Sequence, residues 1–363
     1  MNKKNRIKTI IFGLIFGCTF LLCVFKPNEE FSIAERRPLK SFPALTVSKI
    51  QSGRFMEEFE DYVLDQFPFR DGFREIKAWM EKNIFLKKNN NDIYVGDGYA
   101  VEMVYPMDEI SIQNSSKVMK MIYDTYLKNS GSNVYFSMIP DKNYFLAEEN
   151  GQLTMDYALF MNKMKENLSF MNYIDIADSL SVEDYYRTDS HWRQEAIIDT
   201  AVLLNEKMGT SITGNYNEQE IDRPFKGVYT GQWTLPLEED KVVCLSNSMI
   251  DQYNVYDYEN DRTIPVYDME KAKGNDMYET YLGGSLSLIT IENPKRNGER
   301  ELILFRDSFG SSIAPLLAEG YSKVTLIDIR YIRWERLEQF VDFRDKDVLF
   351  LYSTALLNHN EIR

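Results

Sequence analysis

The last third of the chain alternates short apolar segments with segments of helical periodicity. The apolar segments ELILFRD, KVTLIDI and DVLFLYS begin at residues 301, 323 and 347. Between them lie FGSSIAPLLAEG and ERLEQFVDF, whose apolar residues recur at a spacing typical of helices. Short buried strands that alternate with helices form a mostly parallel sheet covered on both faces. The pattern therefore predicts an α/β fold.

The same alternation extends upstream, over a domain that we place at residues 91–363. DIYVGDGYAVEM has the pattern of a β-hairpin around a Gly-Asp-Gly turn. A predicted helix at 114–128 precedes the strand NVYFSMIP, and a second helix at 155–168 precedes YIDI. A third helix is expected from about residue 192 to 208. Residues 215–299 are rich in Tyr, Gly and Asp, and we expect an irregular or β-rich insertion there.

The N-terminus differs in kind from the rest of the chain. Residues 1–8 contain four basic side chains, and residues 9–25 contain no charge. As a helix, that apolar run would span about 26 Å, which is enough to cross a bilayer. Basic residues before it predict a cytoplasmic tail at 1–8, a single-pass transmembrane anchor at 9–25 and an extracytoplasmic remainder at the cell membrane.

Two other interpretations of this N-terminus stay open. A cleaved signal peptide would normally have a shorter apolar core and a small-x-small cleavage site, which is not evident here. A lipoprotein box at Ile15-Phe16-Gly17-Cys18 has an unsuitable Phe, and its cysteine lies in the middle of the apolar run. We therefore favour an uncleaved anchor.

We interpret residues 26–90 as an extended and helical lead-in to the domain at residues 91–363. A Pro-punctuated segment, FSIAERRPLKSFPALT, precedes two helical patterns that are separated by Phe67-Pro68-Phe69. Apolar residues recur at helical spacing in the second pattern, at Phe73, Ile76, Trp79 and Met80. We expect these helices to pack on the domain.

Charge and residue usage exclude two classes of function. After the first 26 residues the chain has 37 basic and 56 acidic side chains, and such a surface repels nucleic acid. The chain has two histidines and three cysteines, and two of the cysteines lie in the apolar run. This inventory argues against a metal site of the Cys/His kind, and we expect no cofactor.

ELILFRDSFGSS predicts a strand that turns sharply into a helix, with Ser308 on the turn. A serine there projects its hydroxyl from the carboxyl edge of the sheet, beside the free N–H groups of the helix. The alternative is that Asp307 or Ser308 only caps the helix.

Asp189-Ser190-His191 supplies the partners that such a serine needs. In an extended segment, residues i and i+2 point to the same side, so Asp189 can hold the imidazole of His191 in one tautomer. His191 can then take the Ser308 proton and return it. The alternative is a structural histidine packed under Trp192.

Several segments together resemble the DHHW family of exported bacterial proteins. They are Arg36-Arg37-Pro38-Leu39, Asp65-Gln66-Phe67-Pro68-Phe69-Arg70, Thr188-Asp189-Ser190-His191-Trp192, Tyr281-Leu282-Gly283-Gly284 and Asp307-Ser308-Phe309. That family is similar to the SGNH-hydrolase-like domain of periplasmic alginate O-acetyltransferases. Ser190 departs from the Asp-His-His-Trp pattern, which puts only a secondary contact in doubt.

The resemblance implies Ser308 as the nucleophile, His191 as the general base and acid, and Asp189 as its orienting carboxylate. It implies an O-acetyltransferase that modifies a cell-surface or exported polysaccharide and receives acetyl groups from a membrane-bound O-acyltransferase partner. An acetyl-esterase with the same triad and a non-catalytic anchored glycan-binding or assembly protein are the alternatives.

Five further residues are candidates on less evidence. Gly283 and Gly284 could donate backbone N–H groups to the oxyanion, beside that of Ser308, or form a plain turn. Lys142, after the strand NVYFSMIP, could contact substrate or be solvated. Tyr186 and Arg187 could contact sugar or acetyl groups, and the other tyrosines of residues 215–282 could form a sugar platform, although aromatic residues more often pack.

Overall fold

The computed structural model describes residues 3–362 and divides into two compact units. The first unit contains residues 1–90 and 231–236, of which residues 1 and 2 lie outside the described range. The second contains residues 91–230 and 237–363, and residue 363 is likewise outside that range. The predicted tail at residues 1–8 is therefore described only from residue 3.

The first unit begins with a long apolar helix. Residues Lys4–Phe25 of this helix are long and apolar enough to cross a membrane. The elements of the unit are α1 (Lys3–Phe25), β1 (Phe31–Ser32), β2 (Arg37–Pro38), α2 (Val47–Gln51), α3 (Arg54–Asp65), α4 (Arg70–Asn83) and β3 (Asn89–Asn90).

Polar contacts fix the end of α3 to the extended segment before it. Arg37 donates from Nη1 to Asp65 Oδ2 at 2.8 Å and from Nη2 to Oδ1 at 2.5 Å. Gln66 Nε2 donates to the carbonyls of Glu29 and Lys40 at 2.8 and 3.1 Å. The bidentate guanidinium–carboxylate pair is a strong, directional contact. These motif residues therefore hold the end of α3 against the extended segment.

The apolar residues of α4 have exposed side chains. Phe73, Ile76 and Trp79 are 55%, 56% and 54% exposed, and Met80 is exposed as well. The helix expected from this spacing is confirmed, and its packing on the domain stays a prediction.

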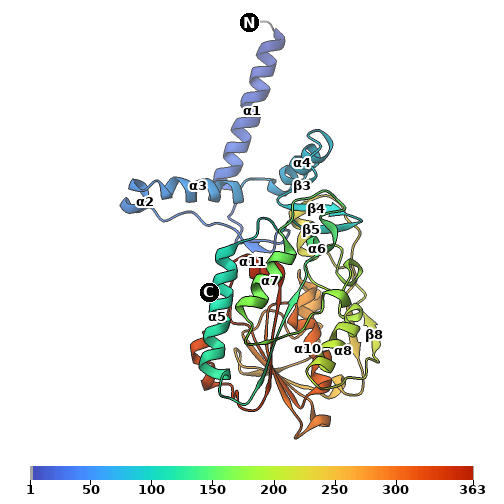
Figure 1. The fold of residues 1–363 in the computed structure, drawn as a ribbon. Helices are drawn as coiled ribbons and strands as arrows, with labels where there is room; N and C mark the ends of the chain where they lie inside the picture. The colour runs from blue at the N-terminus through green and yellow to red at the C-terminus, as the bar shows by residue number, and fades with distance from the viewer. Residues whose placement is uncertain (1–2, 363) are drawn as a thin grey trace. The chain divides into compact units, whose positions relative to one another are not determined.

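An eight-stranded sheet forms the centre of the second unit (Figure 1). Its strand order is β11-β10-β12-β14-β13-β15-β6-β7, in which β14, β13, β15, β6 and β7 are parallel and the other three are antiparallel. The sheet strands are β6 (Asn133–Ile139), β7 (Asn172–Tyr173), β10 (Asn254–Asp257), β11 (Arg262–Ile264), β12 (Leu288–Glu292), β13 (Glu301–Arg306), β14 (Lys323–Ile327) and β15 (Asp347–Ser353). Outside this sheet are β4 (Ile93–Gly96), β5 (Tyr99–Glu102), β8 (Asn217–Glu220) and β9 (Val243–Ser246).

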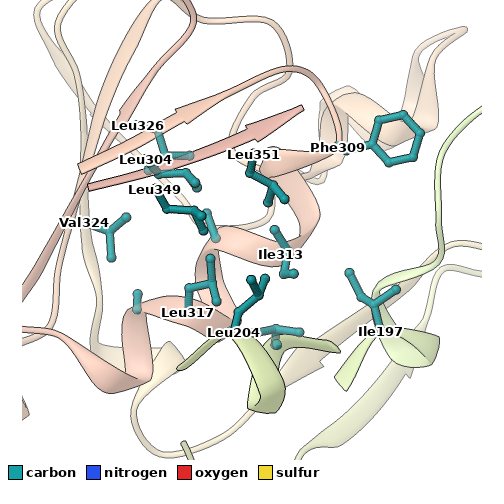
Figure 2. Close-up of a cluster of buried hydrophobic side chains, with 14 of the residues drawn as sticks. Ile197, Leu204, Leu304, Phe309, Ile313, Leu317, Val324, Leu326, Leu349 and Leu351 are labelled. Atoms are coloured by element: carbon teal, nitrogen blue, oxygen red, sulfur yellow. The ribbon is translucent and has the colours of Figure 1, made fainter. Parts of the chain in front are cut away.

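Helices cover both faces of the sheet, as the apolar strands require (Figure 1). On β13, Leu302 and Leu304 belong to one core, whereas Ile303 and Phe305 belong to the other. Figure 2 shows the first core, with residues of α8 and α10 packed against the strands. The helices of this unit are α5 (Glu109–Ile122), α6 (Lys142–Leu146), α7 (Tyr157–Asn167), α8 (Ile198–Lys207), α10 (Gly310–Leu317) and α11 (Thr354–Asn358). Helix α9 (Val228–Trp233) begins in this unit, and its residues from 231 on belong to the first unit. The fold is mixed α/β with a mostly parallel sheet, which confirms the predicted class.

Most predicted elements are present, with four differences. The hairpin of β4 and β5 and the strands β6, β13, β14 and β15 are confirmed. Of the predicted strand YIDI, only Tyr173 lies in a strand, because β7 ends there. The helix expected from residue 192 begins only at Ile198, after a 3₁₀ turn at Gln194–Ala196. The expected helix ERLEQFVDF is a 3₁₀ segment, Trp334–Gln339. Within residues 215–299, where an irregular or β-rich insertion was expected, β10, β11 and β12 extend the central sheet, and β8 and β9 form a two-stranded sheet of their own.

Candidate active site

Ser308 lies on the turn between β13 and α10, at the carboxyl edge of the sheet. Asp307 shapes this turn, because its carboxylate accepts from the N–H of Phe309 at 3.0 Å and from that of Ser353 at 2.8 Å. The turn is tight: a Cβ added to Gly310 would come within 2.6 Å of the Arg306 side chain. Asp307 therefore makes the turn, and Ser308 is left to face the adjoining loop.

The loop that contains Asp189 and His191 is closed at its base by backbone contacts. Tyr185 and Trp192 form a β-bridge, and the N–H of Tyr186 donates to the His191 carbonyl at 3.0 Å. The segment is a bend and not the extended strand that the spacing argument assumed. Trp192 is buried, and its Nε1 donates to Ser312 Oγ at 2.9 Å, so the loop is fastened to α10.

Asp189, His191 and Ser308 form a continuous hydrogen-bonded series. His191 Nδ1 is 2.6 Å from Asp189 Oδ1, and His191 Nε2 is 2.7 Å from Ser308 Oγ. A carboxylate can only accept, so Nδ1 carries the proton and Nε2 accepts from the serine hydroxyl. This arrangement allows the imidazole to remove the Ser308 proton while Asp189 stabilises the imidazolium that results.

The carboxylate of Asp189 is itself held from a second side. The N–H of Val228 donates to Asp189 Oδ2 at 2.9 Å, so both oxygens are engaged. Arg187 and Thr188 lie in the same loop, just before Asp189. Their N–H groups donate to the carboxylate of Asp240 at 2.8 and 2.7 Å. Neither Val228 nor Asp240 was predicted, because each reaches the loop from a segment without a recognisable motif.

Tyr278 packs against one face of the His191 imidazole. Its ring stacks on His191 with centroids 3.7 Å apart and planes 9° apart. Its hydroxyl shares a hydrogen bond with Ser312 Oγ at 2.9 Å and donates to the Ser308 carbonyl at 3.2 Å. Tyr278 belongs to the tyrosine-rich segment that was considered as a sugar platform, but here it packs against the proposed base.

A cavity of about 140 Å³ opens beside Ser308. Besides Ser308, several titratable side chains line this cavity, including those of Glu102, Lys142, Arg330, His359 and Glu361. Glu102 Oε2 accepts from the Tyr229 hydroxyl at 3.1 Å, and burial raises the pKa of this carboxyl above its usual range. The position of His359 near the end of the chain gave no indication that it would reach this cavity.

Lys142 lines the same cavity but is almost completely buried. Its Nζ donates to the carbonyls of Tyr186 and Arg187 at 2.8 and 3.3 Å, just before the Asp189 loop. Burial lowers the pKa of this ammonium to about 7. Lys142 therefore contacts the backbone of the loop, and its side chain is buried and not solvated.

The remaining predicted residues lie apart from the cavity lining. Tyr186 is fully buried, with its hydroxyl 3.3 Å from that of Tyr281, and this burial argues for packing over substrate contact. Arg187 forms an ion pair with Glu238 and lines a separate pocket. Gly283 and Gly284 form a turn with positive φ, in which the Gly284 N–H donates to the Tyr281 carbonyl at 3.2 Å. Within residues 3–362, no group of three His, Cys, Asp or Glu side chains is placed to hold a metal ion.

Solved structures share this fold. A DHHW family protein from Eubacterium siraeum matches with a TM-score of 0.57 at 18% identity, over 75% of this chain and 94% of that one. The chain shares the fold of that DHHW family protein. Bacillus cereus PatB1 with a sulfonyl adduct matches with a TM-score of 0.60 at 16% identity, over 76% of this chain and 98% of that one. The O-acetyltransferase domain of Pseudomonas putida AlgJ matches at 0.45 with 12% identity, over 74% and 92% of the two chains. No family model and no curated protein matches the sequence.

Proposed function

We propose that this chain is a membrane-anchored extracytoplasmic O-acetyltransferase that acetylates a cell-surface or exported polysaccharide. The observation that carries the proposal is the series Asp189–His191–Ser308, with distances of 2.6 and 2.7 Å at the carboxyl edge of an α/β sheet. Support for acyl transfer comes from this chemistry, since an activated serine is a nucleophile for carbonyl carbon. The resemblance of the sequence motifs adds to that support.

The reaction proceeds in two halves. Ser308 Oγ attacks the carbonyl carbon of the acetyl donor while its proton passes to His191 Nε2. The tetrahedral intermediate collapses, the bond to the leaving group breaks, and that group takes the proton from His191. A sugar hydroxyl then attacks acetyl-Ser308 and gives its proton to the same Nε2, which returns it to Ser308 Oγ as the sugar ester leaves. The backbone N–H of Ser308 is our candidate donor to the oxyanion.

The acetyl donor in this proposal is a membrane-bound O-acyltransferase. The reason is topological, since α1 would keep the domain at the membrane surface where an acyl group emerges from such a partner. The apolar length of α1 supports a membrane span. The proposed orientation, with the domain outside, follows from the basic residues that precede the apolar run.

A transfer assay separates the proposal from its enzymatic alternative. The full chain in detergent is incubated with an activated acetyl ester, with and without cell-surface oligosaccharide. The proposal predicts acetylated sugar whose formation depends on Ser308. Free acetate alone, at the same rate with and without sugar, would indicate an acetyl-esterase.

The non-catalytic alternative makes a separate prediction. If the chain only binds or assembles glycans, then Ser308→Ala and His191→Ala will bind the oligosaccharide as the parent does, and all three will lack acetyl transfer and ester cleavage. Activity in the parent that both substitutions abolish excludes this alternative.

A further inference from the structure

Helix α4 turns two of its arginines, Arg70 and Arg74, toward the rest of its own unit. Arg70 Nη1 lies 2.6 Å from Glu35 Oε2, and Arg74 Nη2 lies 3.2 Å from Glu35 Oε1. Arg74 Nη2 also donates to the Gly231 carbonyl at 2.7 Å. Ala78, on the same side of the helix, is 1% exposed. Ion pairs and a small residue therefore attach α4 to the rest of the unit.

The opposite side of α4 is an uncovered apolar stripe. Residues at i, i+3 and i+7 share one face of a helix, and Phe73, Ile76 and Met80 have this spacing, with Trp79 three residues after Ile76. All of its large side chains are exposed, and the exposed apolar surface continues beyond the helix end; these residues are Phe69, Phe73, Ile76, Trp79, Met80, Ile84, Phe85 and Leu86. An amphipathic helix normally buries its apolar face, so the exposure of these side chains indicates an external apolar partner.

The charge and composition around the stripe suit a lipid surface. Residues 70–88 contain six basic and three acidic side chains, although the extracytoplasmic part as a whole is strongly acidic. Apolar residues with a tryptophan on one face and lysines beside them are typical of helices that lie in the plane of a membrane interface. The helix also belongs to the same compact unit as α1. A bilayer that held α1 would thus be a surface available to α4.

We propose that α4 and residues 84–88 lie in the interfacial layer of the bilayer, with the apolar stripe inserted among the lipids. The inference rests on the proposed anchoring by α1. Interfacial helices bury their apolar face about 5–10 Å below the headgroups. Two attachments, one spanning and one interfacial, would restrict rotation of the first unit about α1.

Trp79 provides an intrinsic probe of this proposal. The full chain is reconstituted into phosphatidylcholine/phosphatidylglycerol vesicles, with or without bromine on the acyl chains. The emission of Trp79 is obtained by subtracting the spectrum of Trp79→Phe, since Trp192, Trp233 and Trp334 remain in both proteins. We expect brominated lipid to quench this difference signal about twofold, because the indole would lie at the depth of the upper acyl chains.

Two variants test whether the stripe causes the quenching. Ile76→Glu combined with Met80→Glu should abolish the quenching of Trp79 and leave Ser308 acetylation in detergent unchanged. Leu159→Glu, at a comparably exposed apolar position on α7, should leave the quenching intact.

The outcomes distinguish this inference from the anchoring on which it rests. A chain that floats with the vesicles but whose Trp79 is quenched only by aqueous acrylamide retains its anchor and contradicts the lipid contact. Protection of Trp79 from both quenchers also contradicts it, and would point to a protein partner or a second copy on the stripe. A chain that fails to float contradicts both proposals.

Discussion

Tyr278 lies flat against the imidazole of His191, with the two ring centroids 3.7 Å apart and the planes within 9° of parallel. The same tyrosine donates through its hydroxyl to the Ser308 carbonyl at 3.2 Å. One side chain therefore contacts both the proposed base and the turn that presents the proposed nucleophile. We assign it a positioning role, because its own contacts are to protein groups.

Tyr278→Phe and Tyr278→Leu should separate the two contacts. Phe keeps the stacked ring and loses only the hydroxyl, whereas Leu loses both. Ring stacking contributes about 0.5–1.5 kcal/mol, so we expect kcat/KM for acetyl transfer to be about 2–10-fold lower in the Leu variant than in the Phe variant. Equal rates in the two variants would show that the ring does not position His191.

Asp189→Asn should reduce the rate of Ser308 acetylation by about 10³–10⁴-fold without unfolding the chain. Both oxygens of Asp189 accept hydrogen bonds, from His191 and from Val228. An amide has one acceptor, and if its oxygen faces Val228 then its NH₂ group faces Nδ1 and selects the tautomer that cannot accept from Ser308. Asp199→Asn, an exposed position on α8, is the matched control and should retain parental activity. Circular dichroism checks the fold of both variants.

Lys142 should give the unfolding free energy a recognisable dependence on pH. Its pKa is about 7 in the folded chain against an ordinary value of 10.5, because burial penalises the ammonium. Between these values the unfolded state binds more protons, so this group makes the folded state more stable as pH rises. In Lys142→Met that contribution should be absent.

Urea unfolding at pH 7, 8, 9 and 10 measures this dependence. The midpoint of the parent should rise relative to that of Lys142→Met across the series. The variant should also be less stable by about 1–3 kcal/mol at pH 10, since the carbonyls of Tyr186 and Arg187 lose a buried donor. Parallel pH profiles for the two proteins would contradict the burial argument.

Asp65 should stabilise the first unit in a different range of pH. Its hydrogen bonds with Arg37 lower the pKa of the carboxyl to about 2, against 3.8 in the unfolded chain. A depressed acid contributes stability that is fully present above the unfolded pKa and is lost as pH falls toward 2. The Lys40 N–H donates to Asp65 Oδ2 at 3.0 Å and reports on this contact. Its protection in hydrogen exchange should decrease between pH 4 and 2, and should be low at both pH values in Arg37→Gln.

Local sequence patterns predicted those parts of the site that are formed by residues close together in the sequence. The turn at Ser308 follows from one apolar strand and the helix after it, and Asp189 and His191 are two residues apart. The contacts that complete the site come from distant segments. Tyr278 and Val228 lie in the region without periodicity, so only the folded chain brings them to His191 and Asp189. Periodicity likewise identified the apolar residues of α4 but not the partner that covers them.

The central claim is that Ser308 is the nucleophile. The most direct test is to locate the acetyl group on the chain after reaction with an activated acetyl ester. The full chain is quenched in acid within its first turnover and digested, and the peptides are analysed by mass spectrometry. The account predicts one acetyl group on the side chain of Ser308 in the parent, trace amounts in His191→Ala and none in Ser308→Ala. An acetyl group that forms on another residue at the same rate in Ser308→Ala as in the parent would contradict it.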